Sequence, residues 1–383
     1  MGRHRRLELI ERIQKERKSL VVAYVLSDVP QCEGSISPEA VEELYEVLRD
    51  FKPLGKKPLD LFLFARAGDI TVPWTLVGMI REMFDLFNVI VPHKAHGPAT
   101  MIALGADTII MGERGTLSPI EALVPEVSFW QEHSLEAQGV GVEDVKAVMS
   151  LMESFGRVRE KQKIDGLLRI MERVHPLLLG SMHKQVERIR EECLRLLEKR
   201  KRRFGERRNR RIVQRLISDS FSSHHYITRT EAKETVGLKQ VRTEEALEPH
   251  FRELLSLYEQ EFTAGETLPA ETRSDAFDPE EKFFPDQKRG FLESEKRSRV
   301  LMEDRKVQKI RETAPTIRLD PQIVLPALEI RSDLTGRDAW AFIEGWLQGN
   351  LPALIDEAFV RFRRSLPVLE YKCTSLNRRW VDS

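Results

Sequence analysis

The sequence predicts an α/β protein built on a parallel sheet, and two observations lead to this fold class. First, short runs that are apolar almost throughout recur at residues 20–26, 59–65 and 88–92. Such runs are typical of strands that are buried on both faces of a sheet. Second, the segments between them carry apolar residues three and four positions apart, as amphipathic helices do. Strands that alternate with helices at this spacing indicate βαβ units.

The elements of this α/β core follow one another from residue 20 to about residue 125. After the first strand, Ser37 and Pro38 supply an N-cap and a first-turn proline for a helix over residues 39–51. The further elements that we expect are strands at 59–65, 88–92 and 107–112 and helices at 72–87 and 99–106.

The rest of the chain is predicted to be mainly helical. Residues 222–238 indicate a turn and a strand that lead into a helix capped by Thr230 and ended by Gly237. Helical patterns also cover 142–217 and 245–262, a charged helix and a short strand at 315–319 are expected in the tail, and Trp340, Phe342 and Trp346 lie on a helical stretch. The resulting organisation is an N-terminal helix (1–19), an α/β core (20–140), a helical extension with a basic tip (141–263), a polar linker (264–290) and an α-rich C-terminal segment (291–383).

Composition bounds the function classes. The chain has 383 residues, with Lys+Arg and Asp+Glu balanced at 61 each, so net charge alone predicts no nucleic-acid or membrane partner. Its three cysteines are far apart and form no metal-ligand spacing. The charged helix at the start has no apolar signal-peptide region, and no stretch approaches the roughly 18 apolar residues of a membrane span. We therefore expect a cytoplasmic protein without a membrane span and without a cofactor.

One stretch, residues 89–112, carries the main functional question. Its pattern of strand, sharp turn, short helix and second strand is the way in which several hydrolase folds present a nucleophile. At the turn, where a serine or cysteine would be expected, the chain has Gly97 and Pro98.

The motifs LFLFARAGDITVPW (residues 61–74) and VIVPHKAHGPATMIALGADTIIMGERGTLSPIEAL (residues 89–123) resemble the Clp/crotonase superfamily. Within it, the chain is most similar to the serine dehydrogenase proteinase family, Clp-fold proteases related to ClpP and signal peptide peptidase A. The resemblance covers residues 20 to about 260 and hardly extends to the last ninety. It implies a Clp/crotonase-like fold, a serine at the start of a helix beside a backbone oxyanion hole, a Lys or His base, and assembly into oligomers.

Carried over residue by residue, the family's catalytic site is incomplete here. The first oxyanion element, a pair of glycines, corresponds to Ala67 and Gly68. The nucleophile is expected ten residues before Asp107, which places it at Gly97, a residue without a side chain. The second oxyanion N–H should come from Pro98, which has none. Losing the nucleophile leaves a residual rate enhancement of roughly a thousandfold, and losing one oxyanion donor removes about a hundred- to thousandfold more.

Other residues near the turn are candidate substitutes for the nucleophile or for the base. Thr100 lies one helical turn beyond Gly97, and Ser118 lies on a separate loop in SPIEA, where the family is expected to show a different pattern. Lys146 stands where a lysine base is expected, and His96 beside the turn is a candidate acid or base. Each also has an ordinary structural explanation. A crotonase-like enzyme, which needs only two backbone N–H groups, is another alternative, although Pro98 interrupts that arrangement as well.

A basic run from residue 195 to residue 215 is the second candidate functional feature. It contains eleven Lys or Arg residues against two glutamates, and such a concentration of charge binds phosphate backbones or acidic protein surfaces. A solvated helix–turn–helix tip explains the same pattern. The candidate binding residues are Arg200, Lys201, Arg202, Arg203, Arg207, Arg208, Arg210 and Arg211.

These observations favour a protease-family protein whose own site is degenerate and which acts as a scaffold, a regulator or an inactive subunit of a homo- or hetero-oligomer. The alternatives are an active serine-type peptidase with a rearranged site, a crotonase-like acyl-CoA enzyme, and a nucleic-acid-associated protein.

Overall fold

The computed structural model describes the chain in several stretches: residues 2–30, 32–51, 58–120, 176–217, 225–264, 281–311 and 368–382, with a few isolated positions between 164 and 349. The chain divides into two compact units. The first comprises Met1–Glu266, Gln287–Glu303 and Arg378–Ser383, and the second comprises Thr267–Asp286 and Asp304–Asn377. The two units are described separately below.

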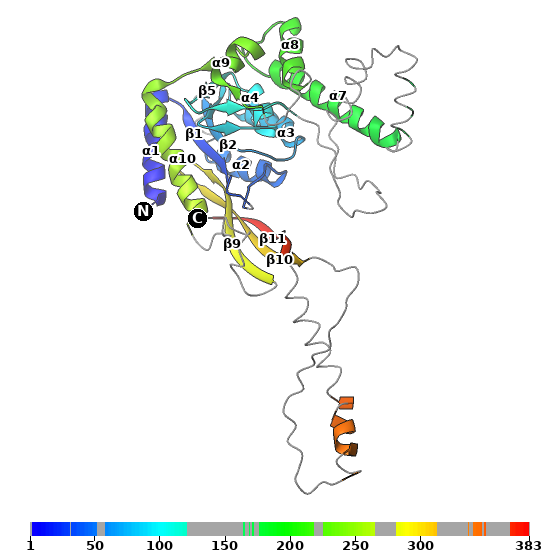
Figure 1. The fold of residues 1–383 in the computed structure, drawn as a ribbon. Coiled ribbons are helices and arrows are strands. Elements are labelled where there is room, and N and C mark those ends of the chain that lie inside the picture. The colour runs from blue at the N-terminus through cyan, green and yellow to red at the C-terminus, as the bar shows by residue number, and fades with distance from the viewer. Residues whose placement is uncertain are drawn as a thin grey trace. The chain divides into compact units, whose positions relative to one another are not determined.

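Parallel strands form the centre of the first unit and confirm the predicted α/β class. The large mixed sheet has the order β11-β10-β9-β1-β2-β3-β5-β8, and β1, β2, β3, β5 and β8 run parallel (Figure 1). The bounds of these five strands are Leu20–Leu26, Leu59–Phe64, Phe87–Val91, Thr108–Met111 and Val241–Arg242. Four of them lie within a residue or two of the predicted ranges. All residues of β1 and β2 are buried, which explains the near-continuous apolar runs in the sequence.

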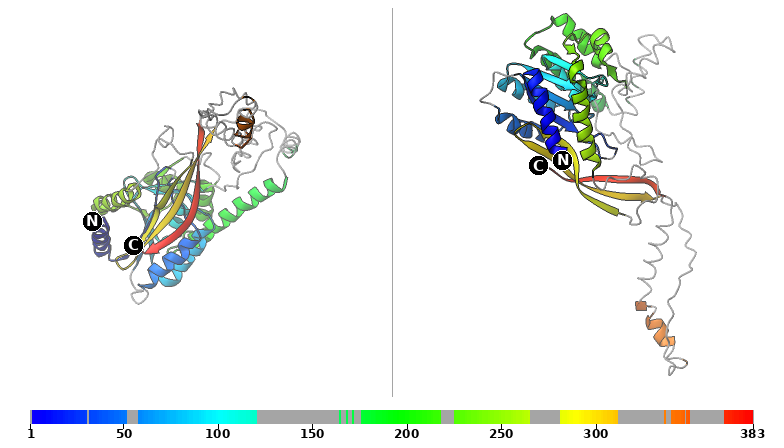
Figure 2. Two further views of the ribbon diagram at one scale, coloured as in Figure 1. Left: turned by 90° about the horizontal axis from the view of Figure 1, so that it is seen from below. Right: turned by 90° about the vertical axis from the view of Figure 1, so that its left-hand side faces the viewer.

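Helices cover both faces of this sheet. On one face, α1 (Gly2–Arg17) and α10 (Glu248–Thr263) lie side by side (Figures 1 and 2). The other face is covered by α2 (Glu39–Arg49), α3 (Val72–Met83), α4 (Pro98–Leu104), α7 (Pro176–Glu198) and α8 (Glu206–Ile217). Alternate residues of β1 belong to the two resulting cores: Val22 and Tyr24 face the second group of helices, whereas Val21 and Ala23 face α1 and α10. None of the helices that the structure describes is long and apolar enough to cross a bilayer.

The same arrangement, a long strand followed by a short one, recurs along the α/β core. After β3 the chain makes the short strand β4 (Lys94–Ala95) and then α4, and after β5 it makes the short strand β6 (Thr116–Leu117). These short strands form a second sheet with the order β4-β6-β7, in which β7 is Ile227–Thr228. Ala65, at the end of β2, bridges to Ala95 in the same way. The core is thus a repeat of related α/β units, as the sequence predicts for a Clp/crotonase-like fold.

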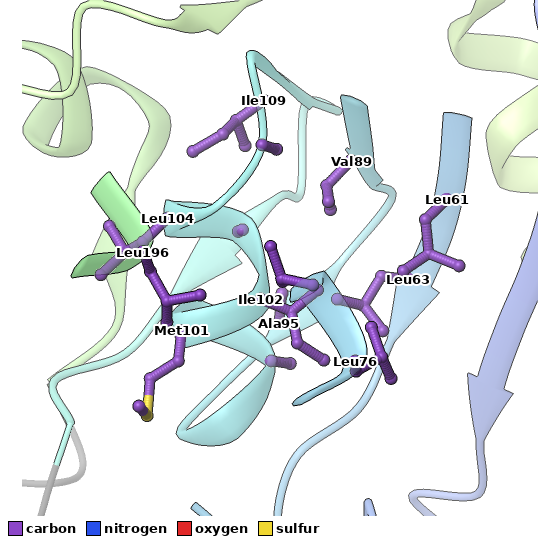
Figure 3. Close-up of a cluster of buried hydrophobic side chains, with 14 of the residues drawn as sticks. Leu61, Leu63, Leu76, Val89, Ala95, Met101, Ile102, Leu104, Ile109 and Leu196 are labelled. Atoms are coloured by element: carbon purple, nitrogen blue, oxygen red, sulfur yellow. The ribbon is translucent and has the colours of Figure 1, made fainter. Parts of the chain in front are cut away.

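Helix α4, which follows the candidate catalytic turn, is held from both sides. All seven of its side chains are buried. Figure 3 shows Leu104 beside Leu196 of α7, and Ile102 on the side of Leu63 and Leu76. Because the helix is short, this packing rather than intrinsic propensity keeps it helical and fixes the direction of the turn before it.

The prediction of an α-rich C-terminal segment is wrong where the structure describes it as strands. Residues predicted as the end of the linker and as a charged helix form β9 (Glu281–Glu293) and β10 (Ser298–Arg311), and the chain ends in β11 (Val368–Asp382). Within the first unit, β9 pairs antiparallel with β1. The many charges of these strands obscure the strand pattern, yet they find partners that lie far away in the sequence. Arg299 pairs with Glu43 at 2.7 Å, and Glu293, completely buried, accepts a hydrogen bond from Arg6 at 2.7 Å.

In the second unit, the outer parts of the same strands carry their own polar contacts. Asn377 donates a hydrogen bond to Asp304 at 3.0 Å, and Gln308 donates one to Glu281 at 2.5 Å. Residues 340–346 are helical, as predicted, and Trp340 is exposed there. The predicted strand at 315–319 lies outside the described residues.

The helix predicted before Gly237 begins earlier than expected. It consists of α9 (Arg229–Glu231) and one π-helical turn (Ala232–Val236), and Thr228 rather than Thr230 caps it, through a hydrogen bond from the Glu231 N–H. Thr228 is the last residue in extended backbone, which is the conformation that an N-cap needs. Gly237 ends the helix with a positive φ of 94°, as predicted.

Candidate functional site

The turn between β4 and α4 has an unusual backbone. Gly97 adopts φ 54° and ψ −116°, a conformation that side-chain-bearing residues rarely enter. Among the residues that the structure describes, no atom outside the two adjacent residues lies within 4 Å of a Cβ atom built at this position. A sharp, strained strand-to-helix turn with free space at its tip is how a nucleophilic serine is presented in hydrolases. Position 97 therefore has room for a nucleophile and carries none.

The backbone N–H groups at this turn are not available to an oxyanion. The Gly97 N–H donates to the Ser118 hydroxyl oxygen at 2.8 Å. Pro98 has no N–H, and the Ala99 N–H donates to the His96 carbonyl oxygen at 3.0 Å. An oxyanion hole needs donors aimed at the place where negative charge develops. The three consecutive residues at the start of α4 offer none.

The two hydroxyl side chains near the turn are both engaged in the structure. Thr100, completely buried, donates to the Ala95 carbonyl oxygen at 2.7 Å and accepts from the Ser118 N–H at 3.1 Å. The Ser118 hydroxyl donates to the Pro119 carbonyl oxygen at 2.8 Å while it accepts from Gly97. Neither hydroxyl contacts a histidine or lysine among the residues described. These contacts favour a structural role for both.

His96 is a buried part of the same turn. Its Nε2 atom lies 2.9 Å from the Thr116 hydroxyl, which itself donates to the His93 carbonyl oxygen at 3.1 Å. The network therefore assigns the proton to Nε2 of His96. The ring also stacks on Tyr226, with centroids 4.8 Å apart. Burial, with the nearby positive charge of Lys94, lowers the pKa of His96 to about 4, so the ring is neutral at pH 7.

The loop after β2 lies beside this turn, because Ala65 bridges to Ala95. Gly68, the candidate oxyanion residue of this loop, has a φ of 152°, and a Cβ there would come within 2.5 Å of the backbone of Ile36. Ile36 forms backbone hydrogen bonds with Ala67 and Asp69 on either side of Gly68. Within the described stretches, nothing accepts a hydrogen bond from the Gly68 N–H. The glycine is thus required by close backbone packing, whatever else it does.

The structure brings His96, Gly97 and Pro98 together with Thr100 and Ser118. Gly68 lies on the neighbouring loop. Lys146 falls outside the described residues, so its role as a base stays a prediction.

Several cations of the basic run (residues 195–215) contact other residues of the run, so their charges are not all exposed on one face. Arg200 is 2% exposed, and its guanidinium lies 3.9 Å from the centre of the Phe204 ring. Arg208 contacts the same ring at 4.9 Å, and Arg210 pairs with Glu206 at 2.5 Å. The other predicted binding residues are exposed: Lys201, Arg202, Arg203, Arg207 and Arg211.

A groove at the amino ends of the parallel strands includes part of this tip. Its volume is about 720 Å³, and Arg200, Lys201 and Arg202 contribute to its wall. Further wall residues were not predicted: Lys239, Gln240 and Arg242. They are about forty residues away in the sequence, on the short strand β8 and the turn before it, and no local pattern marks them. Among the described residues, no group of three His, Cys, Asp or Glu side chains is placed to hold a metal ion.

Comparison with known sequences gives distant relatives. No family model matches the chain. Two proteins of Methanocaldococcus jannaschii, both named as uncharacterized, are similar: MJ0137 is 28% identical over 124 residues, which is 30% of this chain and 42% of that protein. MJ1495 is 23% identical over 260 residues, which is 67% of this chain and 77% of that protein. The chain thus spans less than half the length of the first of these relatives.

Comparison with solved structures gives weak matches. A membrane-bound stomatin-specific protease in complex with a substrate peptide has a TM-score of 0.34 at 12% identity, over 55% of this chain and 71% of that one. The decarboxylase domain of CurF from Lyngbya majuscula has a TM-score of 0.22 at 11% identity, over 46% and 94% of the two chains. At these scores the matches say nothing about activity.

Proposed function

We propose that this protein is a Clp/crotonase-like member of the serine-protease group that performs no acyl transfer at its turn and acts as a scaffold or regulatory subunit of an assembly. One observation carries the proposal. Position 97 has the backbone of a nucleophile turn and free space at its tip, but it is a glycine followed by a proline. Two parts of the serine mechanism, the nucleophile and the second oxyanion donor, are therefore missing together.

The alternative of a rearranged peptidase is disfavoured by the contacts of the remaining hydroxyls. Thr100 is a completely buried residue of α4, and the Ser118 hydroxyl accepts the hydrogen bond of the Gly97 N–H. Using Ser118 as a nucleophile would release that N–H, and no histidine or lysine of the described part of the chain contacts the Ser118 hydroxyl to take its proton. The crotonase alternative meets the same obstacle as the serine mechanism, because the N–H of Gly97 is occupied and Pro98 has none.

Rebuilding the turn tests the proposal. In the double variant Gly97→Ser with Pro98→Ala, the serine enters the free space and residue 98 regains an N–H. We expect a fluorophosphonate probe to label Ser at position 97 in this variant, as read by peptide mapping. The matched control, Gly97→Ala with Pro98→Ala, carries the same backbone strain without a hydroxyl and should stay unlabelled. An unlabelled serine variant that is folded would contradict the idea that the turn derives from a nucleophile site.

Assembly is the second part of the proposal and rests on the resemblance to oligomeric proteases. Native mass spectrometry of the purified protein should show a mass of two or more subunits. A monomer at micromolar concentration would contradict a homo-oligomeric scaffold. The remaining form of the proposal would then be a hetero-oligomer with a related subunit. Co-expression with such a subunit would test that form.

A further inference from the structure

The groove at the amino ends of β3, β5 and β8 has a strongly positive wall. Five cationic side chains contribute to it, from two separate segments: Arg200, Lys201, Arg202, Lys239 and Arg242. Neither segment alone makes a site. The fold places them on the same groove, because β8 pairs with β5 and the basic tip is anchored next to the start of β5.

Among the described wall residues, a single carboxylate stands against these five cationic side chains. Asp107 is the acidic residue of the wall, and its carboxylate is already used. It accepts hydrogen bonds from Arg81 at 2.6 Å and from the Lys201 N–H at 2.7 Å. Burial alone would raise the pKa of Asp107, but these hydrogen bonds outweigh burial and keep the pKa below its usual value. Asp107 therefore holds the tip in place, and its one negative charge, which also acts on Arg200, is outnumbered by the five cations of the wall.

Two buried wall residues have polar atoms without a partner. Gln240 is 6% exposed, and neither its side-chain oxygen nor its side-chain nitrogen finds a hydrogen-bond partner among the described residues. One guanidinium nitrogen of Arg200, Nη2, is also without a described partner. Buried polar groups in folded proteins are normally hydrogen-bonded, so these atoms can form a hydrogen bond with a ligand or with water that enters the groove.

The surroundings of Arg200 compensate its positive charge only in part. Burial, together with the neighbouring charges of Arg81 and Arg208, lowers the pKa of Arg200 to about 10. A bound anion would favour the charged guanidinium and provide an acceptor for it.

We propose that this groove binds a small ligand that carries several phosphate groups, such as a nucleoside triphosphate or inorganic tripolyphosphate. Its volume of about 720 Å³ lies within the range of roughly 300–1,000 Å³ that is usual for small-molecule pockets. Arginine and lysine from two sides bind phosphate oxygens, and the arginines do so with two parallel hydrogen bonds. The ring of Phe204 is already covered by Arg200 and Arg208, so the groove offers no platform of stacked bases such as a single-stranded nucleic acid uses. The inference is independent of whether the turn at Gly97 is active.

Isothermal titration calorimetry of the full chain at low salt tests this inference, with sodium tripolyphosphate and ATP as the probes. We expect one site per chain for each. The groove variant Lys239→Ala with Arg242→Ala should bind about tenfold more weakly or worse, because two phosphate contacts are lost. The matched control is Arg207→Ala with Arg211→Ala, which removes two exposed cations of the same basic run that are not part of the groove wall. It should bind within about twofold of the wild type, since exposed charges outside a site act weakly through solvent.

Three results would overturn the inference. The first is no saturable binding of either probe. The second is an equal loss in the groove variant and the control, which would mean that the whole basic run attracts anions without a site. The third is a single-stranded RNA that binds more tightly than tripolyphosphate and depends as much on Arg207 and Arg211 as on the groove, which would make the run a nucleic-acid surface. Thermal unfolding of both variants verifies that they are folded.

Discussion

The two ends of the parallel strands differ in how completely their polar groups are paired. At the carboxyl ends, Thr100, Ser118 and His96 each have a hydrogen-bond partner on the turn or on the loop beside it, and Nδ1 of His93 is the exception among the described side chains next to this turn. At the amino ends, Gln240 and Arg200 line an open groove with polar atoms for which the structure describes no partner. The difference shows that the hydroxyls and the imidazole beside a catalytic-looking turn can be engaged in structural hydrogen bonds, while side chains at the opposite end of the same sheet have polar atoms without a described partner.

The largest effect is expected from Gly68→Ala beside the turn. The new Cβ would overlap the backbone of Ile36, which lies 2.5 Å away, in a strained backbone conformation. We expect a loss of at least about 4 kcal/mol in the free energy of unfolding, measured by denaturant titration, or an insoluble protein. The control Gly180→Ala lies in α7, where no described residue beyond the helix's own backbone comes within 4 Å of the new Cβ, and it should stabilise the protein by about 0.5–1 kcal/mol. Equal effects of the two substitutions would show that the loop at Gly68 is not tightly packed.

The second prediction concerns pH. A histidine in an unfolded chain titrates near pH 6.5, whereas folded His96 keeps a pKa of about 4 because of its burial. Above pH 6.5 both states are neutral and the full stability is present. Between these two values the unfolded state binds a proton that the folded state does not, so stability falls as the pH is lowered, by about 3 kcal/mol at most. The variant His96→Gln should lose less stability between pH 7 and pH 4.5, by urea unfolding; an unchanged pH dependence would mean that His96 is solvated.

A third, smaller effect is expected from Thr100→Val. The substitution keeps the shape of the side chain but leaves the Ser118 N–H and the Ala95 carbonyl without their partner. A loss of about 2 kcal/mol in the free energy of unfolding is expected, since buried groups left unpaired each cost roughly 1–3 kcal/mol before relaxation. An unchanged free energy of unfolding would show that water or a shift of the backbone replaces these hydrogen bonds. The polar groups at the turn would then not depend on Thr100 for their pairing.

The smallest change in the free energy of unfolding is expected at the groove, and there it is a gain in stability rather than a loss. Gln240→Leu removes two buried polar atoms that have no described partner, so it should stabilise the protein by about 1 kcal/mol in the absence of ligand. The increase should appear as a higher melting temperature in phosphate-free buffer. A clear loss of stability would mean that the amide of Gln240 is satisfied within the protein, and the contrast between the two ends would disappear.

Much of the core was predictable because its signals are local. The apolar runs at β1, β2 and β3 come from burial on both faces, whereas Gly97 was singled out by the resemblance to the Clp/crotonase superfamily, which places the nucleophile ten residues before Asp107. The C-terminal strands were not predictable, because the charges of Arg299 and Glu293 look like those of a solvated helix until their distant partners are known. The groove was missed for the same reason: its two halves are separate in the sequence, and only the pairing of β5 with β8 joins them.

The central claim, that the turn at Gly97 performs no acyl transfer, is tested most directly by intact-mass analysis of the wild-type protein after treatment with a fluorophosphonate probe, with an active serine hydrolase as the positive control. The account predicts no adduct. A stoichiometric adduct that maps to Ser118 or Thr100 would contradict it and would show that the hydroxyl contacts described for these residues break during catalysis.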